Sequence, residues 1–349
     1  LLGASETMMP HVVDYMTVWF AGIVLIVGPM VASNILRALG NAVLPSVMMM
    51  GAAVVNLVLD PFFILDDVFG LPGLGWGVSG AALATVAANG VTFLLISWYL
   101  VFREKLIDFH WHGFDELFHN WGEIARVGAP AAASNTFNPF ALTIVMSGLG
   151  MAQFGDAAVA GIGVGARVEA FGLVPLFALS ASIGPVTGQN GGAGLTDRVR
   201  QAFLTSFTFC VVWGTAMAAI LFVAKGWLAP AFLPSEMGQG VAISYWTWVP
   251  ITIAGYGITM AASAGFNGLG RPSFGVMITS GRALLLMAPF AVVGAIVAGA
   301  PIGVILGVAA ANVIAGIATA FYVLTRAPME ARKRRARKPK PPTNAELPA

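Results

Sequence analysis

The sequence predicts an all-α integral membrane protein, and three observations support this fold class. Of the 349 residues, 58% are hydrophobic and only 10% are charged, whereas a soluble domain usually carries about 25% charged residues. The mean hydropathy is correspondingly high, at +0.83. The apolar residues also form long continuous runs instead of alternating with polar ones, which favours helices over a membrane barrel.

Nine of these runs are long enough to cross a bilayer as helices, since a spanning helix needs roughly 20 mainly apolar residues. Short connectors rich in glycine and proline separate them. The expected transmembrane helices are residues 16–36, 44–65, 78–102, 122–149, 158–187, 199–224, 241–267, 273–298 and 301–325.

Lysine and arginine gather at one side of these spans, which identifies that side as cytoplasmic. The residues on this side are Arg37, Arg103, Lys105, Arg126, Arg198, Arg200, Arg271, Arg326 and the tail 332–340. The opposite side has Lys225. We therefore expect a multi-pass protein of the bacterial inner (plasma) membrane with a cytoplasmic C-terminus. The tail is interpreted as a topology anchor that attracts anionic lipid, because no aromatic or folded module supports nucleic-acid binding.

An internal repeat relates the beginning and the end of the chain. The stretch RALGNAVLPS (37–46) resembles NGLGRPS (267–273), and GAALATVAANG (80–90) resembles GVILGVAAANV (303–313). The pairs are Gly40 with Gly270, Pro45 with Pro272, Gly80 with Gly303 and Asn89 with Asn312. Both copies start from the same side of the membrane, so the repeat is parallel. Parallel repeats about an axis normal to the membrane are typical of transporters.

The repeat also predicts a domain organisation. Three spans between 122 and 224 have no counterpart in the first copy, so we expect about one hundred further residues before Leu1 and twelve helices in two pseudo-symmetric six-helix lobes. Residues 1–102 would then be the remainder of the N-lobe, with helices 4–6. Residues 103–121 would be a cytoplasmic loop between the lobes, 122–326 the C-lobe with helices 7–12, and 327–349 the basic tail.

Several segments resemble the multidrug and toxic compound extrusion (MATE) family. They are LRALGNAVLP, NLVLDP, LPGLGWGVSGAALAT and GIGVGARVEAFGLVPLFALSASIGPVTGQNGGAG, in this order along the chain. The resemblance covers nearly everything except the tail and begins just before the fourth of twelve helices. It implies a two-lobed transporter that moves substrates by alternating access.

Asp60 stands out because it lies within an apolar run, AAVVNLVLDPFFIL (52–65). A carboxylate near the centre of a membrane helix costs about 2.5–3.5 kcal/mol on insertion scales, so such a residue usually has a function. Asn56 shares its helix face, and Pro61 denies a backbone donor to the carbonyl of Leu57. This polar notch could hold a proton or a sodium ion. Alternatively, Asp60 is a helix-end residue at the outer interface.

The resemblance agrees with an ion site at this position. One MATE branch builds such a site from an aspartate on the first helix, an Asn and an Asp four apart on the fifth, and a Thr on the sixth. Asn56 and Asp60 match the fifth-helix pair, and Thr85 matches the threonine. The coupling ion would be H⁺ or Na⁺, and neither another metal nor a cofactor is expected.

A second MATE branch has a glutamate on the seventh helix, eight residues after Gly-x-Pro. In this sequence Gly128-Ala129-Pro130 leads to Asn138 at that position, so no proton site is expected there. Asn135 and Asn138 belong to a polar stripe that would line the substrate cavity. Hydrogen bonding between helices is the alternative for the same two side chains.

Three further charges fall within predicted spans: Arg167, Glu169 and Arg282. Arg167 and Glu169 are two residues apart, so they do not share a helix face. For all three we expect a structural or gating role, in preference to substrate contact, with Arg282 near carbonyls or a carboxylate.

These observations predict a multidrug efflux antiporter. It would exchange a small organic substrate, cationic and amphipathic, for H⁺ or Na⁺, and it would act as a monomer. A lipid-linked oligosaccharide flippase of the same superfamily is one alternative, although it should carry several cavity cations, and only Arg167 and Arg282 are intramembrane. A truncated remnant that does not transport is another. An enzyme is disfavoured, since no nucleophile–base pair, metal cluster or cofactor motif is found.

Overall fold

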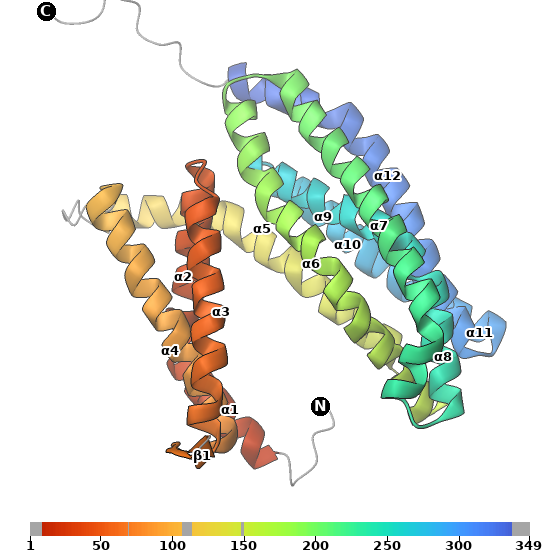
Figure 1. Ribbon diagram of the computed structural model, residues 1–349. Helices are drawn as coiled ribbons and strands as arrows, with labels where there is room; N and C mark the ends of the chain where they lie inside the picture. Colours follow the sequence, from red (N-terminus) through yellow and green to blue (C-terminus); the bar gives the residue numbers. More distant parts are fainter. Residues whose placement is uncertain (1–8, 69, 107–113, 148–149, 337–349) are drawn as a thin grey trace, which may run out of the picture. The chain divides into compact units, whose positions relative to one another are not determined.

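The computed structural model describes residues 9–68, 70–106, 114–147 and 150–336, and this part of the chain is almost entirely helical (Figure 1). The predicted all-α membrane fold is confirmed. Two compact units divide the chain, residues 1–112 and 113–349. The boundary falls within the predicted loop 103–121, and the assignment of the units to two lobes stays a prediction.

The first unit contains four helices and a small hairpin (Figure 1). Its elements are α1 (Met9–Ala21), α2 (Ile23–Ala38), α3 (Val43–Ile64), β1 (Asp67–Val68), β2 (Leu71–Pro72), α4 (Gly77–Trp98) and the π-helical turn η1 (Tyr99–Arg103). Helices α1 and α2 meet at a bend of 53°, and together they are long and apolar enough for one span. Helix α4 packs against α1, α2 and α3.

The second unit holds the longer helices. Its elements are α5 (Phe114–Met146), the 3₁₀ turn η2 (Ala152–Phe154), α6 (Asp156–Gly192), α7 (Thr196–Phe232), α8 (Glu236–Trp248), the 3₁₀ turn η3 (Pro250–Thr252), α9 (Ile253–Gly268), α10 (Pro272–Ser280), the π-helical η4 (Gly281–Met287), α11 (Ala288–Ala298) and α12 (Pro301–Ala336). Helix α9 packs against α6, α7, α10 and α12, so it occupies the middle of this unit.

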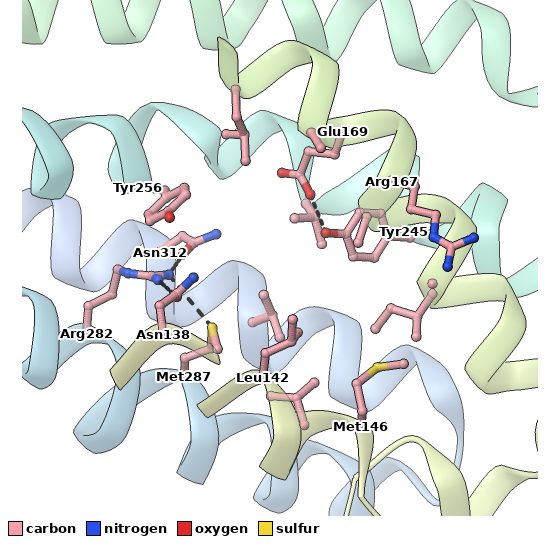
Figure 2. Close-up of a pocket in the computed structure, with 18 of the residues that line it drawn as sticks. Asn138, Leu142, Met146, Arg167, Glu169, Tyr245, Tyr256, Arg282, Met287 and Asn312 are labelled. Carbon is pink, nitrogen blue, oxygen red and sulfur yellow. Dashed lines mark hydrogen bonds between the residues drawn. The ribbon is translucent and has the colours of Figure 1, made fainter. Parts of the chain in front are cut away.

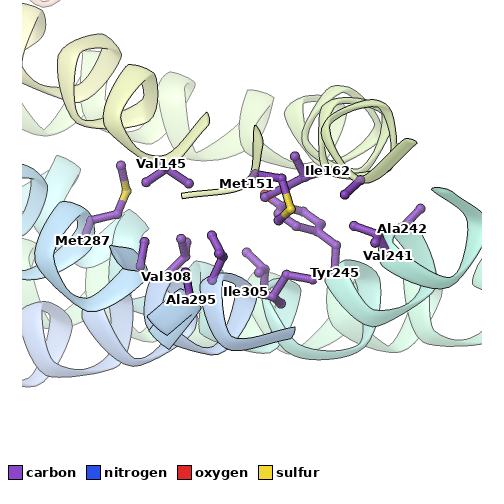
Figure 3. Packing of buried hydrophobic residues seen from close by; sticks show 14 of the residues in the cluster. Val145, Met151, Ile162, Val241, Ala242, Tyr245, Met287, Ala295, Ile305 and Val308 are labelled. Atoms are coloured by element: carbon purple, nitrogen blue, oxygen red, sulfur yellow. The ribbon is translucent and has the colours of Figure 1, made fainter. Parts of the chain in front are cut away.

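Two buried clusters stabilise the second unit. One surrounds α9 and includes Phe203 and Phe266, which are completely buried. The other joins α5, α6, α8, α11 and α12, and Figure 3 shows Met151, Ile162 and Ile305 converging in it. Because lipid is as apolar as these side chains, close packing must supply much of the stabilisation.

The helices of the described residues do not contradict the nine predicted spans. Seven helices meet the length and hydropathy criteria for crossing a membrane, or eight if α1 and α2 count as one span. The remaining predicted span, 122–149, lies mostly within α5, which contains the shorter apolar segment Thr136–Met146. Helix α5 also begins at Phe114, inside the predicted loop. Phe118 and Trp121 lie one turn apart on it, and their ring centroids are 6.4 Å apart.

The internal repeat is visible in the backbone. Helices α2 and α9 end in the same way, with Gly40 at φ 94° and Gly270 at φ 72°. Gly40 N–H donates to the carbonyl of Arg37, and Gly270 N–H donates to that of Asn267. The following residues, Asn41 and Arg271, donate to the carbonyls of Leu36 and Phe266. Both ends are therefore Schellman-type caps, which need a residue in the left-handed region. The two helix ends share this local structure, and the pairing of Gly40 with Gly270 stays a prediction, since α6 ends with the same kind of cap at Gly194.

Candidate functional site

The first unit contains the polar notch on α3. Asn56 Nδ2 donates a hydrogen bond of 3.1 Å to Asp60 Oδ1, and both side chains are partly buried. Helix α3 continues through Pro61 and ends at Ile64, so Asp60 lies about one turn from the helix end. The structure thus brings Asn56 and Asp60 together near the end of α3. The ion site and the interfacial residue both stay predictions.

Thr85 is not part of this hydrogen-bonded pair. Its hydroxyl donates to the carbonyl of Ala81, one turn earlier on α4, at 3.0 Å. Among the described residues no hydrogen bond joins Thr85 to Asn56 or Asp60, although α3 and α4 pack together. No group of three His, Cys, Asp or Glu residues that could hold a metal ion is found in the part of the chain that was placed. The role of Asn56, Asp60 and Thr85 in ion coupling stays a prediction.

The second unit encloses a cavity of about 470 Å³, shown in Figure 2. Helices α5, α6, α8, α9 and α12 and the π-helical η4 contribute its wall, which is mostly apolar. The polar and charged residues in the wall are Asn138, Arg167, Glu169, Tyr245, Tyr256, Arg282 and Asn312. A cavity of this size and lining is suited to a small organic ligand.

Arg282 is the centre of a hydrogen-bond network in this wall. Its side chain is buried, and Nη1 donates to Asn312 Oδ1 at 2.9 Å while Nη2 donates to Asn138 Oδ1. The guanidinium carbon lies 4.2 Å from the centre of the Tyr256 ring, a cation–π contact. Asn312 Nδ2 in turn donates to Thr252 Oγ1 at 3.3 Å. The network therefore ties α5, η3, η4 and α12 together.

Arg282 reaches the cavity from a π-helical segment between α10 and α11. Such single π turns are rare and are often found at functional sites, because the extra residue changes the direction of the side chains. The position of Arg282 within an apolar run predicts carbonyls or a carboxylate near it. The structure places it against the side-chain carbonyl oxygens of two asparagines.

Glu169 and Arg167 lie on α6, and both line the cavity. Glu169 is buried and accepts a hydrogen bond from the hydroxyl of Tyr245 on α8. Arg167 is exposed, and Figure 2 shows its guanidinium pointing away from Glu169. The two side chains have different surroundings, as their spacing predicts.

The structure tests the cavity prediction for Asn138 but not for Asn135. Asn138 lines the cavity, and it also bonds between helices, so the two interpretations of this residue hold together. Asn135 lies on α5, but its side chain is outside the described residues.

Sequence reasoning missed Tyr245, Tyr256 and Thr252 as cavity or network residues. The available signal was weak, because each is a single polar side chain in an apolar run, close to the break at Pro250. Asn312 had been paired with Asn89 in the repeat but had been given no role.

Comparisons with known proteins agree on one family. The MatE family model matches residues 130–293. The chain is 33% identical to the FAD transporter of Shewanella oneidensis over 86% of its own length and 65% of that protein. It is 31% identical to the probable multidrug resistance protein YpnP of Bacillus subtilis over 57% of its length and 42% of that protein. The chain therefore spans less than two thirds of these curated relatives.

A solved structure is similar to the whole fold. The MATE transporter VcmN of Vibrio cholerae, in its bent form, superposes with a TM-score of 0.83 at 26% identity. The match covers 95% of this chain and 73% of that one. The likeness thus extends over both units and is accompanied by recognisable sequence identity.

Proposed function

We propose that this chain is a membrane transporter of the MATE family, which exports amphipathic organic compounds in exchange for H⁺ or Na⁺. Members of this family are multi-pass membrane proteins that carry small molecules, and they are not enzymes. The observation that carries the proposal is the cavity of about 470 Å³, with an apolar wall and a few convergent polar groups.

Asp60 is the proposed coupling residue, with Asn56 and Thr85 as neutral ligands. The hydrogen bond from Asn56 to Asp60 supports this role, because it holds the carboxylate in one orientation. A cation that binds there competes with a proton for the same oxygens, which is the physical basis of antiport. Coupling then requires that the bound ion favours one of two conformations over the other.

The relatives' names support two kinds of substrate. The probable multidrug resistance protein supports the cationic, amphipathic substrate that the sequence predicts. The FAD transporter supports a second candidate, an anionic nucleotide with a planar ring system. A lipid-linked oligosaccharide flippase is less favoured, since only Arg167 and Arg282 supply cationic side chains among the residues that line the cavity. The bacterial inner membrane, a monomeric state, a cytoplasmic C-terminus and anionic lipid at the tail also stay proposals.

Transport in proteoliposomes tests the function. We would impose a pH or sodium gradient and follow a fluorescent organic cation and FAD in parallel, for the wild type, Asp60→Asn and the control Asp66→Asn. Asp66 is an exposed carboxylate just beyond α3, so its loss should leave transport unchanged. Where the native protein is longer than this chain, the assay uses the whole protein.

Three outcomes are informative. Gradient-driven transport that Asp60→Asn abolishes and Asp66→Asn preserves supports coupling at Asp60. Equal transport by all three proteins makes Asp60 an interfacial residue and contradicts the coupling role. If the folded protein transports neither compound, the proposed export function is contradicted. The oligosaccharide flippase and a chain that does not transport would then be the remaining alternatives.

A further inference from the structure

We propose that Arg282 anchors an anionic group of the ligand, so that the cavity of the second unit binds aromatic compounds bearing a carboxylate or a phosphate. The identification of this ligand as the exported substrate rests on the proposed function. Binding itself is a separate property and can be measured without any gradient.

The buried charge of Arg282 has no ion-pair partner among the described residues. Its oxygen partners are the neutral amides of Asn138 and Asn312, and within the described residues no carboxylate lies within the 4.0 Å limit for an ion pair. A buried cation without a counterion is costly. An anionic ligand that enters the cavity would supply the missing counterion.

The second argument concerns the hydrogen-bonding capacity of the guanidinium. Arginine has five N–H donors, and three bonds are present: one to each asparagine and one to the sulfur of Met287 at 3.7 Å. Within the described residues, Nε–H and one N–H on Nη2 are left without an acceptor. A guanidinium binds planar carboxylates and phosphates through pairs of such donors.

The third argument is the total charge of the wall. Two arginines, Arg167 and Arg282, face one carboxylate, Glu169, so the formal charge of the lining is +1 with Glu169 ionised. Glu169 is in addition hydrogen-bonded to Tyr245. Beside a mostly apolar wall, this excess of positive charge attracts anions more strongly than it would in bulk water.

The aromatic part of the proposed ligand follows from the rest of the lining. Tyr256 covers the guanidinium, and Phe177 and Tyr245 are also in the wall, with Leu142 and Met146 opposite in Figure 2. Aromatic rings offer offset or edge-to-face contacts to a planar ligand. Such a ligand would place its charge at Arg282 and its ring system along the apolar wall.

Two dyes with the same fused three-ring core and opposite charge test the proposal: carboxyfluorescein, which is anionic, and rhodamine 123, which is cationic. Their binding to the purified protein in nanodiscs would be followed by fluorescence polarisation. We expect the wild type to bind carboxyfluorescein at least about tenfold more tightly, the size of one charged hydrogen bond.

Asn312→Asp is the sharpest variant, because it changes the shape of the side chain little and puts a carboxylate oxygen where Arg282 already donates at 2.9 Å. This internal counterion should weaken carboxyfluorescein binding about tenfold or more and leave rhodamine 123 binding unchanged or tighter. Arg282→Gln should have the same selective effect. The control, Asn190→Asp, adds the same charge on α6 outside this cavity and should change neither affinity.

The results separate this inference from the proposed function. It is overturned if the wild type prefers rhodamine 123, if it binds neither dye, or if carboxyfluorescein binding survives in folded Asn312→Asp or Arg282→Gln protein. The preference of the wild type decides the matter even if both variants fail to fold. Selective anion binding without gradient-driven movement would instead uphold the inference and count against export.

Discussion

Individual polar side chains in the second unit are stabilised by specific partners instead of by water. Glu169 is buried on α6, and the hydroxyl of Tyr245 on α8 donates to it. The ring of Tyr256 contributes differently, by covering the guanidinium of Arg282. Its hydroxyl makes no hydrogen bond within the described residues. The two tyrosines therefore allow the effect of one hydroxyl to be separated from the effect of the ring.

Tyr245→Phe should destabilise the protein by about 1–3 kcal/mol, because it leaves the buried carboxyl group of Glu169 without this donor. Tyr256→Phe keeps the ring and should change the free energy of unfolding by less than about 0.5 kcal/mol. Unfolding in mixed detergent micelles would measure both changes. Equal stability of the two variants would contradict a stabilising Glu169–Tyr245 hydrogen bond.

At the scale of helices, the close approach of α9 and α12 positions the network around Arg282. A Cβ atom at Gly255 on α9 would overlap the backbone carbonyl of Asn312 on α12, and one at Gly316 would meet Gly255 in the same way. These glycines let the two helices touch through their backbones, a packing mode common in membranes. Asn312 is thereby brought to Thr252 and Arg282.

Gly255→Ala should force α9 and α12 apart and cost about 1–3 kcal/mol of stability, the usual penalty for overpacking. It should also weaken ligand binding, since it displaces Asn312. Gly226→Ala on α7 is the control, because a Cβ there meets nothing within 4 Å. That variant should be neutral or more stable by about 0.5–1 kcal/mol. Thermal unfolding of both variants would give the comparison, and an unchanged Gly255→Ala protein would contradict the close packing.

At the scale of the whole molecule, the parallel repeat gives the two units matching local structures. The glycine at the end of α2 and the glycine at the end of α9 have left-handed φ values and the same backbone hydrogen bonds. Equivalent positions also show close packing at Gly80 and Gly303. A Cβ at Gly80 would overlap the carbonyl of Phe63, and one at Gly303 would overlap that of Gly294.

Gly40→Ala and Gly270→Ala should therefore have similar costs, about 1–2 kcal/mol each, since a Cβ is disfavoured in the left-handed region. A Cβ at Gly270 would meet nothing within 4 Å, so the backbone conformation dominates the cost there. Gly51→Ala and Gly281→Ala serve as matched controls in the two units, with open space around the added methyl group. Unfolding measurements that find either cap variant as stable as its control would contradict the equivalence.

The sequence predicted more of the fold than of the cavity. Apolar runs, basic flanks and the Leu-Gly turns are local features, so they indicated the spans, the repeat and the glycine caps without a structure. The start of α5 was missed because residues 114–121 mix aromatic and charged side chains and resemble an interfacial segment. Asn56 and Asp60 could be linked from sequence because they are four residues apart on one helix.

The sequence by itself predicted a helical membrane protein that resembles a transporter family, because hydropathy and motifs can be recognised from short stretches of the chain. The tertiary structure decided what surrounds the intramembrane charges. Arg282 forms hydrogen bonds with Asn138 and Asn312, which are 144 and 30 residues away in the sequence. Glu169 is hydrogen-bonded to Tyr245, which is 76 residues away. These contacts depend on how the helices cross and on where a π-helical turn changes the direction of a side chain. No local pattern in the sequence contains that information.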